Sequence, residues 1–186
     1  LTDAAGNESA RSPDLAVTID AAAPNPPGVT VPEGPVINAI EAADGVTVEV
    51  TLPVGAAAGD LIAISIDGTA PISHSVTAAD LTAGKVSLTL PKPDISTAGE
   101  GPAILTTNYT DRAGNTAAPV TTPLDIDTTA PDAPNAPDMT ADSDTGLSNT
   151  DNITTESKPI FTIAPPAAGE TPNLYIDGVK VPSTFD

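Results

Sequence analysis

The chain has 186 residues, with 25 acidic residues against 6 lysines and arginines, a formal net charge of −19 and no cysteine. Nucleic-acid and membrane phosphates would repel such a charge, which excludes DNA binding and favours cations or basic partners. No apolar run approaches the ~18 residues of a membrane helix. Without cysteine no disulfide can stabilise a small domain, so bound metal ions are the expected stabilising element.

The chain starts with a sequence block that recurs later in the chain. No signal peptide, with basic residues followed by an apolar stretch, precedes this block, so we expect an excised piece of a longer protein. TDAAGN at Thr2 recurs as TDRAGN at Thr110, an offset of 108, and IDAAAP at Ile19 recurs as IDTTAP at Ile126, an offset of 107. Two shorter blocks keep the same order at offsets of 110 and 111, namely IDG at Ile66 and Ile176, and VTL at Val50 aligned with FTI at Phe161. This single period indicates tandem repeats.

The period predicts three parts: residues 1–23 as the C-terminal end of a preceding repeat, 24–130 as a complete repeat, and 131–186 as the N-terminal part of a following repeat. As given, the third part lacks its last strands, so it is expected to be incomplete.

Five strands are predicted in the complete repeat, because apolar residues alternate with polar ones there. They cover 46–52, 61–67, 85–90, 104–110 and 120–126. Pro123 in the last of these belongs on an edge or at a bulge, since proline cannot donate to a strand ladder. The 21 prolines and the Thr/Val-rich runs leave no long amphipathic stretch, so helix is not expected.

Turn signals separate these strands, and about seven short strands in ~100 residues are typical of an immunoglobulin-like sandwich. The predicted fold class is therefore all-β, with tandem immunoglobulin-like β-sandwich domains. Tyr109 stands where such sandwiches often keep a tyrosine whose hydroxyl ties a corner.

After the complete repeat, a link with prolines at 131, 134 and 137 is expected to stay extended. The segment DSDTGLSNTDNIT follows it, with aspartates at alternating positions and Gly146 for a tight turn. This spacing is not that of an EF-hand, because the twelfth position from Asp142 is Ile153 rather than glutamate.

The order of motifs in the chain resembles the bacterial Ig-like repeats of giant non-fimbrial surface adhesins exported by type I secretion, including the giant adhesin of Salmonella. The motifs are TDRAGN, the strand ending in IDTTAP, the proline-rich link, and DSDTGLSNTDNIT before KPIFTI. The resemblance covers essentially the whole chain. It implies an elongated rod of repeats, stiffened by calcium at the joints, whose tip binds host glycans for virulence-related attachment. It also implies an extracellular or cell-surface location. The complete repeat departs from the pattern, because VINAIEAADG replaces the Asp-rich segment there.

Calcium takes six to eight oxygen ligands from carboxylates, carbonyls and water, and neighbouring carboxylates on a stiff link repel each other unless a cation lies between them. Sandwich topology brings the loop before the last strand to the joint with the preceding repeat, where Asp20, Asp111 and Asn115 are expected to converge. At the other end, Glu41, with Asn38 and Asp44, is expected near Asp125 and Asp127. The third group of candidate ligands is Asp142, Asp144 and Asp151, either within the third unit or toward the next joint.

Two simpler interpretations of the acidic residues remain open. The aspartates can serve as solvated surface, and TDRAGN can be a turn in which Asp111 only accepts backbone N–H bonds. Both roles are compatible with metal binding.

No catalytic constellation is apparent, and the chain is predicted not to be an enzyme. His74 is the only histidine, and no nucleophile elbow or oxyanion loop accompanies it. The predicted function is a non-catalytic spacer of a bacterial surface adhesin, with calcium ions and neighbouring repeats as partners and host glycans bound by other parts of the parent protein. The alternatives are a calcium-dependent carbohydrate-binding module, which would need an exposed aromatic platform, and an accessory domain beside a catalytic unit.

Overall fold

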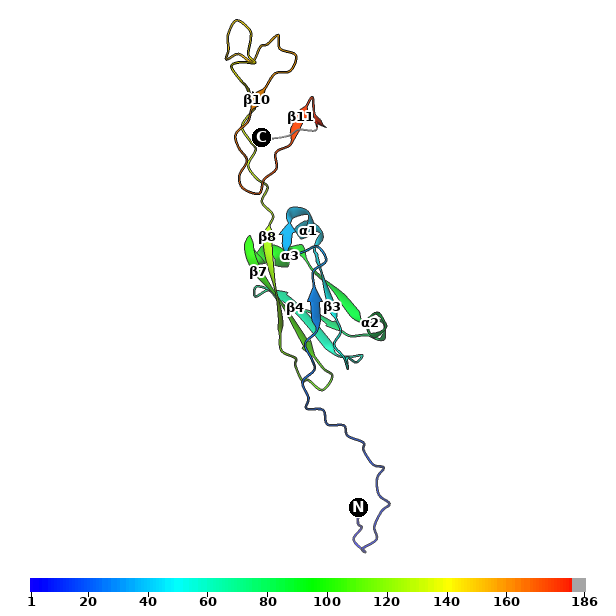
Figure 1. The fold of residues 1–186 in the computed structure, drawn as a ribbon. Coiled ribbons are helices and arrows are strands. Elements are labelled where there is room, and N and C mark those ends of the chain that lie inside the picture. The colour runs from blue at the N-terminus through cyan, green and yellow to red at the C-terminus, as the bar shows by residue number, and fades with distance from the viewer. Residues whose placement is uncertain (182–186) are drawn as a thin grey trace. The chain divides into compact units, whose positions relative to one another are not determined.

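The structure is a computed structural model that describes residues 1–181, so the last five residues of the expected third unit, 182–186, lie outside the described residues. It contains two compact units, Leu1–Thr129 and Ala130–Asp186. Strands dominate the described chain, and the short helices lie in the first unit (Figure 1).

The first unit is built from two sheets. One has five strands in the order β2-β8-β7-β4-β5, in which only β2 and β8 are parallel neighbours. Its strands are β2 (Val36–Asn38), β4 (Leu61–Ile66), β5 (Ile72–Ser75), β7 (Gly101–Thr110) and β8 (Val120–Asp127). The other sheet has the antiparallel order β1-β3-β6, with β1 (Gly28–Thr30), β3 (Val46–Thr51) and β6 (Lys85–Leu90).

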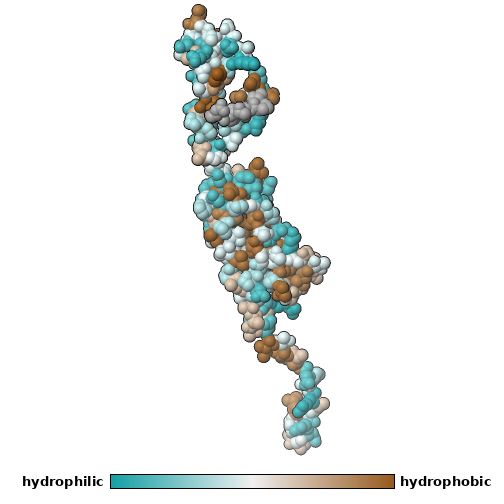
Figure 2. All heavy atoms as spheres, viewed as in Figure 1, coloured by the Kyte–Doolittle hydropathy of each residue, from teal (hydrophilic) through white to brown (hydrophobic). Residues whose placement is uncertain are grey.

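One apolar core joins the two sheets into a sandwich. Every second residue of β3 and β4 is buried, as the alternation predicted, and the inward faces of β6, β7 and β8 belong to the same cluster. The core consists almost entirely of valine, isoleucine, leucine and alanine, with Tyr109 as its only aromatic residue among those described. On the face drawn in Figure 2, hydrophobic residues reach the surface of this unit in small groups between hydrophilic ones.

Pro123 occupies a position where β8 has no second neighbour. It lies opposite Ile104 of β7, and the N–H and carbonyl of Ile104 bond with Asp67 instead of β8. The ring nitrogen of Pro123 therefore faces away from β7, toward the side on which β2 pairs only from Asp125 onward. The prediction of an edge position is confirmed for this half of the strand.

The expectation of no helix was wrong, although the helices are short. They are α1 (Ala39–Asp44), α2 (Ala78–Ala83) and α3 (Lys92–Ala98). The first two begin with capping boxes, Asn38 with Glu41 and Thr77 with Asp80, which satisfy the free N–H groups of the first turn. The capping pairs are present in the sequence, but helices of six residues are too short to show a long amphipathic pattern.

The second unit contains two short antiparallel pairs. β9 (Asp138–Met139) pairs with β10 (Phe161–Thr162), and β11 (Leu174–Ile176) pairs with β12 (Val179–Val181). Residues 128–137, which include the three link prolines, form no helix or strand. Within residues 1–181 no helix has the length and apolar character needed to cross a bilayer.

Candidate cation-binding loops

The TDRAGN loop connects β7 to the segment before β8 and is closed by its own aspartate. Asp111 Oδ1 accepts the backbone N–H groups of Ala113 and Asn115 at 2.9 and 2.8 Å, and Oδ2 accepts the Asn115 side-chain amide at 2.9 Å. These bonds lower the pKa of Asp111, chiefly the bond from the Asn115 side chain. Gly114 has φ of 93°, which a side chain would strain.

The first copy of the block, TDAAGN, has the same geometry. Asp3 Oδ1 accepts the N–H groups of Ala5 and Asn7 at 2.9 and 2.8 Å, and Oδ2 accepts the Asn7 amide at 2.8 Å. Gly6 has φ of 90°. The repeated sequence is therefore a repeated structure, and the turn interpretation of the aspartate applies to both copies.

Asn115 brings the first expected ligand group together. Its side-chain amide donates to the backbone carbonyl of Asp20 at 3.2 Å as well as to Asp111. Asp20 and Asp111 line a common groove of about 660 Å³. The Asp20 carboxylate accepts only the Ala22 N–H among the hydrogen bonds found, so it retains free lone pairs.

A buried carboxylate that the sequence analysis missed lines the same groove. Asp60 is 3% exposed and accepts the hydroxyl of Tyr109 at 2.6 Å. The Tyr109 hydroxyl therefore holds a loop in place, as predicted for a corner tyrosine. Its hydrogen-bond acceptor is the side chain of Asp60 rather than the backbone. Burial and then the Asp60 carboxylate raise the pKa of Tyr109, so its hydroxyl keeps the proton that it donates.

At the other end of the sandwich, the second expected group is brought together only in part. Asn38 lies opposite Asp127 in the parallel pairing of β2 with β8. The Glu41 carboxylate, however, accepts the N–H of Asn38 at 2.9 Å and caps α1. Asp125 and Asp127 are exposed on β8, while Glu100, which no pattern singled out, accepts both donors of Thr128.

The third expected group lies in the second unit, and one of its members is buried. Asp144 is 3% exposed; its Oδ2 accepts the N–H of Asn152 at 3.1 Å, and its Oδ1 is buried without a hydrogen-bond partner. Asp142 and Asp151 are exposed. Gly146 is needed for space, because a Cβ there would lie 2.7 Å from the carbonyl oxygen of Ile153.

Side chains alone do not complete a metal shell in any of these loops. Among the described residues, no three acidic, histidine or cysteine side chains are grouped closely enough to hold an ion. Calcium also accepts amide oxygens, such as that of Asn115, backbone carbonyls and water.

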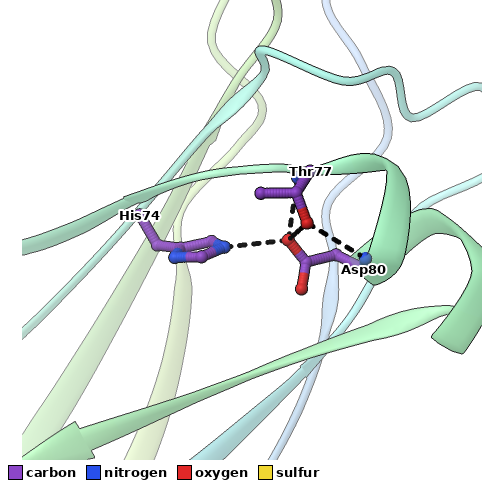
Figure 3. Close-up of polar contacts among 3 residues, drawn as sticks. All are labelled: His74, Thr77 and Asp80. Carbon is purple, nitrogen blue, oxygen red and sulfur yellow. Dashed lines mark hydrogen bonds and ion pairs between the residues drawn. The ribbon is translucent and has the colours of Figure 1, made fainter.

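His74 belongs to a cap rather than to a cluster of reactive groups. Figure 3 shows its ring directed at Asp80, and Nε2 lies 2.9 Å from Asp80 Oδ2, which also accepts the N–H and hydroxyl of Thr77. The bonds from His74 and then Thr77 lower the pKa of Asp80 to about 2. The trio joins β5 to the start of α2.

Comparison with known proteins finds similarity only at the level of solved structures. No family model matches the chain, and no curated protein matches it. A solved structure described as giving structural insight into host cell surface retention of a 1.5-MDa bacterial ice-binding adhesin aligns over 58% of this chain and 33% of its own, with 23% identity and a TM-score of 0.42. The chain thus spans about a third of the length of that solved chain.

Proposed function

We propose that this chain is a run of Ig-like repeats that serve as non-catalytic spacers in a bacterial surface adhesin, outside the cell, with calcium bound at or near the joints. The observation that carries the proposal is the recurrence of loop geometry, not only of sequence, at a nearly constant period. A chain that repeats its loops at this period is built to extend by addition of units.

Three pairs of equivalent loops support this proposal. The two TDxAGN loops lie 108 residues apart with matching hydrogen bonds. The Asp-Gly turns at Asp67 and Asp177 lie 110 apart, and both aspartates have positive φ, of 35° and 51°. The third pair is also 110 apart: Asp60 accepts the Ala57 N–H at 2.7 Å, and Glu170 accepts the Ala167 N–H at 2.9 Å.

The strand order of the first unit supports the Ig-like assignment. The neighbours β8, β7 and β4 follow the order G-F-C of an immunoglobulin sandwich, and β1, β3 and β6 follow A-B-E. In such a sandwich the first and last strands run toward the same end, which places the joining segments at opposite ends of each unit.

Calcium is supported by the donor set and by one unsatisfied atom. A carboxylate oxygen buried without a donor is costly, and a cation removes that cost. Asp144 Oδ1 is such an atom, and the groove lined by Asp20 and Asp111 adds two acidic residues, with Asn115 hydrogen-bonded to both of them. These hard oxygen donors fit calcium, which would supply a positive centre that fixes the loops.

Calorimetric titration of the whole chain with calcium tests the metal. We expect affinities of about 10⁻⁴ to 10⁻³ M, as in extracellular modules, and the loss of one site in Asp144→Asn. Glu156→Gln is the matched control, since it removes one exposed charge from the same unit. Absence of binding to the unchanged chain would refute the calcium proposal.

Small-angle scattering tests the spacer. Calcium is expected to lengthen the average particle compared with chelator, because ligation by Asp20 and Asp111 would fix the segment that precedes the sandwich. Equal dimensions in both conditions would leave any stiffness to the prolines alone.

A further inference from the structure

We infer that Asp60 is a positioning residue for the TDRAGN loop and sets that loop's placement relative to the segment around Asp20. This inference rests on the proposed calcium function, which it deepens by naming a residue that acts through others. Asp60 precedes β4 and lies outside every group of ligands that the sequence indicated.

The contacts of Asp60 come from three separate segments. Oδ2 accepts the Tyr109 hydroxyl at 2.6 Å from β7 and the Ala57 N–H at 2.7 Å from its own loop. Oδ1 accepts the Arg112 N–H at 3.0 Å from the TDRAGN loop. A carboxylate that is 3% exposed requires such donors, so the three segments are held at fixed distances from one another.

A series of contacts connects Arg112 to the proposed ligands. Arg112 follows Asp111 directly, the Asp111 carboxylate holds Asn115, and Asn115 donates to the carbonyl of Asp20. The Asp60 carboxylate is hydrogen-bonded to none of the proposed ligands itself. Its effect on a bound cation passes through the backbone at Arg112.

Gly59 shows how closely the two loops approach. A Cβ at this position would lie 3.2 Å from Arg112 Cδ, and the φ of 97° disfavours any side chain. The Arg112 side chain therefore packs over the backbone that precedes Asp60, beside the hydrogen bond to its own N–H.

The second unit repeats half of this arrangement. Gly169 has φ of 91°, and Glu170 accepts the N–H of Ala167, three residues earlier, as Asp60 accepts that of Ala57. An acidic residue after a positive-φ glycine thus recurs with its backbone contact, which a chance surface acid would not do.

The TDRAGN loop does not need Asp60 to keep its own shape. Inside the loop, the N–H groups of Ala113 and Asn115 donate to the Asp111 carboxylate, and neither bond involves the Asp60 carboxylate. Loss of Asp60 should therefore shift the loop as a body and separate its ligands from Asp20, while the turn itself persists.

The test combines calcium affinity with amide hydrogen exchange on the whole chain, in Asp60→Asn and Tyr109→Phe. Tyr109→Phe keeps the charge and the core packing and removes one donor to Asp60. We expect calcium to bind about 10-fold more weakly at the Asp20 site, as for other residues that orient metal ligands. Without calcium, the Arg112 amide should exchange faster while the Asn115 amide stays protected.

Asp67→Asn is the matched control, because Asp67 follows the other end of β4 and accepts one backbone N–H, from Ile104. It should leave both readouts unchanged. Unaltered calcium affinity and Arg112 exchange in folded Asp60→Asn protein would overturn the positioning role. If the unchanged chain binds no calcium, the proposed function fails, and the exchange comparison still decides whether Asp60 fixes the loop.

Discussion

Replacing Thr107 by valine tests how the core tolerates a polar atom. Thr107 lies in the middle of β7, between Ile64 of β4 and Val120 of β8. It is fully buried, and its hydroxyl oxygen has no hydrogen-bond partner. Valine has nearly the same shape and places a methyl group where the hydroxyl stands, so the change removes the unpaired polar atom without opening a cavity.

The expected result is a more stable first unit. Burying a hydroxyl without a partner costs about 1–3 kcal/mol in proteins, and a methyl group in its place gains burial energy. We expect the free energy of unfolding to rise by about 1–2 kcal/mol. For a domain of this size, each kcal/mol raises Tm by roughly 4–8 °C.

Urea unfolding followed by circular dichroism, together with calorimetry for Tm, measures the change. Thr121→Val is the control, since the same substitution at an exposed position of neighbouring β8 should alter stability by less than about 0.5 kcal/mol. A folded Thr107→Val protein that is less stable than the unchanged chain would show that the hydroxyl is bonded in the core, contrary to this reasoning.

Two further predictions concern a glycine and a carboxylate. Gly45→Ala should destabilise the first unit by about 1 kcal/mol more than Gly55→Ala. Both glycines have positive φ near 90°, but only at Gly45 would a Cβ clash, at 2.8 Å from Thr89 Cγ2. Equal losses of stability in urea unfolding would contradict the clash. The pKa of Asp80, lowered from 3.8 to about 2 by His74 and Thr77, means that its contribution to stability is present above pH of about 4 and disappears as the pH falls toward 2. NMR titration of the Asp80 carboxyl should show a higher pKa in His74→Gln, and an unchanged pKa would remove His74 as the main cause.

The strands could be predicted because burial on one face of a strand leaves a two-residue period in the sequence. Val46, Val48 and Val50 needed only to be aliphatic and alternate, and the structure buries all three. Helix α1 escaped the same reasoning because six residues are too few to show a helical period. Its signal was instead the pair Asn38 and Glu41, which act through capping rather than through burial.

Repetition marked the part of the candidate site in the first unit, and the run of alternating aspartates marked the part in the second. Asp111 and Asn115 belong to a block that occurs twice, and the structure joins them to Asp20. Asp60 was passed over because GAAAGD is an ordinary turn signal, and only the matching contact of Glu170 shows that the acid recurs. The burial of Asp144 depends on how the segment from Thr140 to Thr155 folds over it, which no local pattern encodes.

The two kinds of repetition in this chain differ for a physical reason. VTL in one unit corresponds to FTI in the next, because a strand position requires only a side chain that fits a pleated surface. TDxAGN is kept almost letter for letter, because Asp111 must accept three donors and Gly114 must adopt positive φ, and few residue types can do either. The strict requirements therefore fall on the loop between β7 and β8 and not on the faces of the sheets, where any aliphatic side chain that fits is accepted.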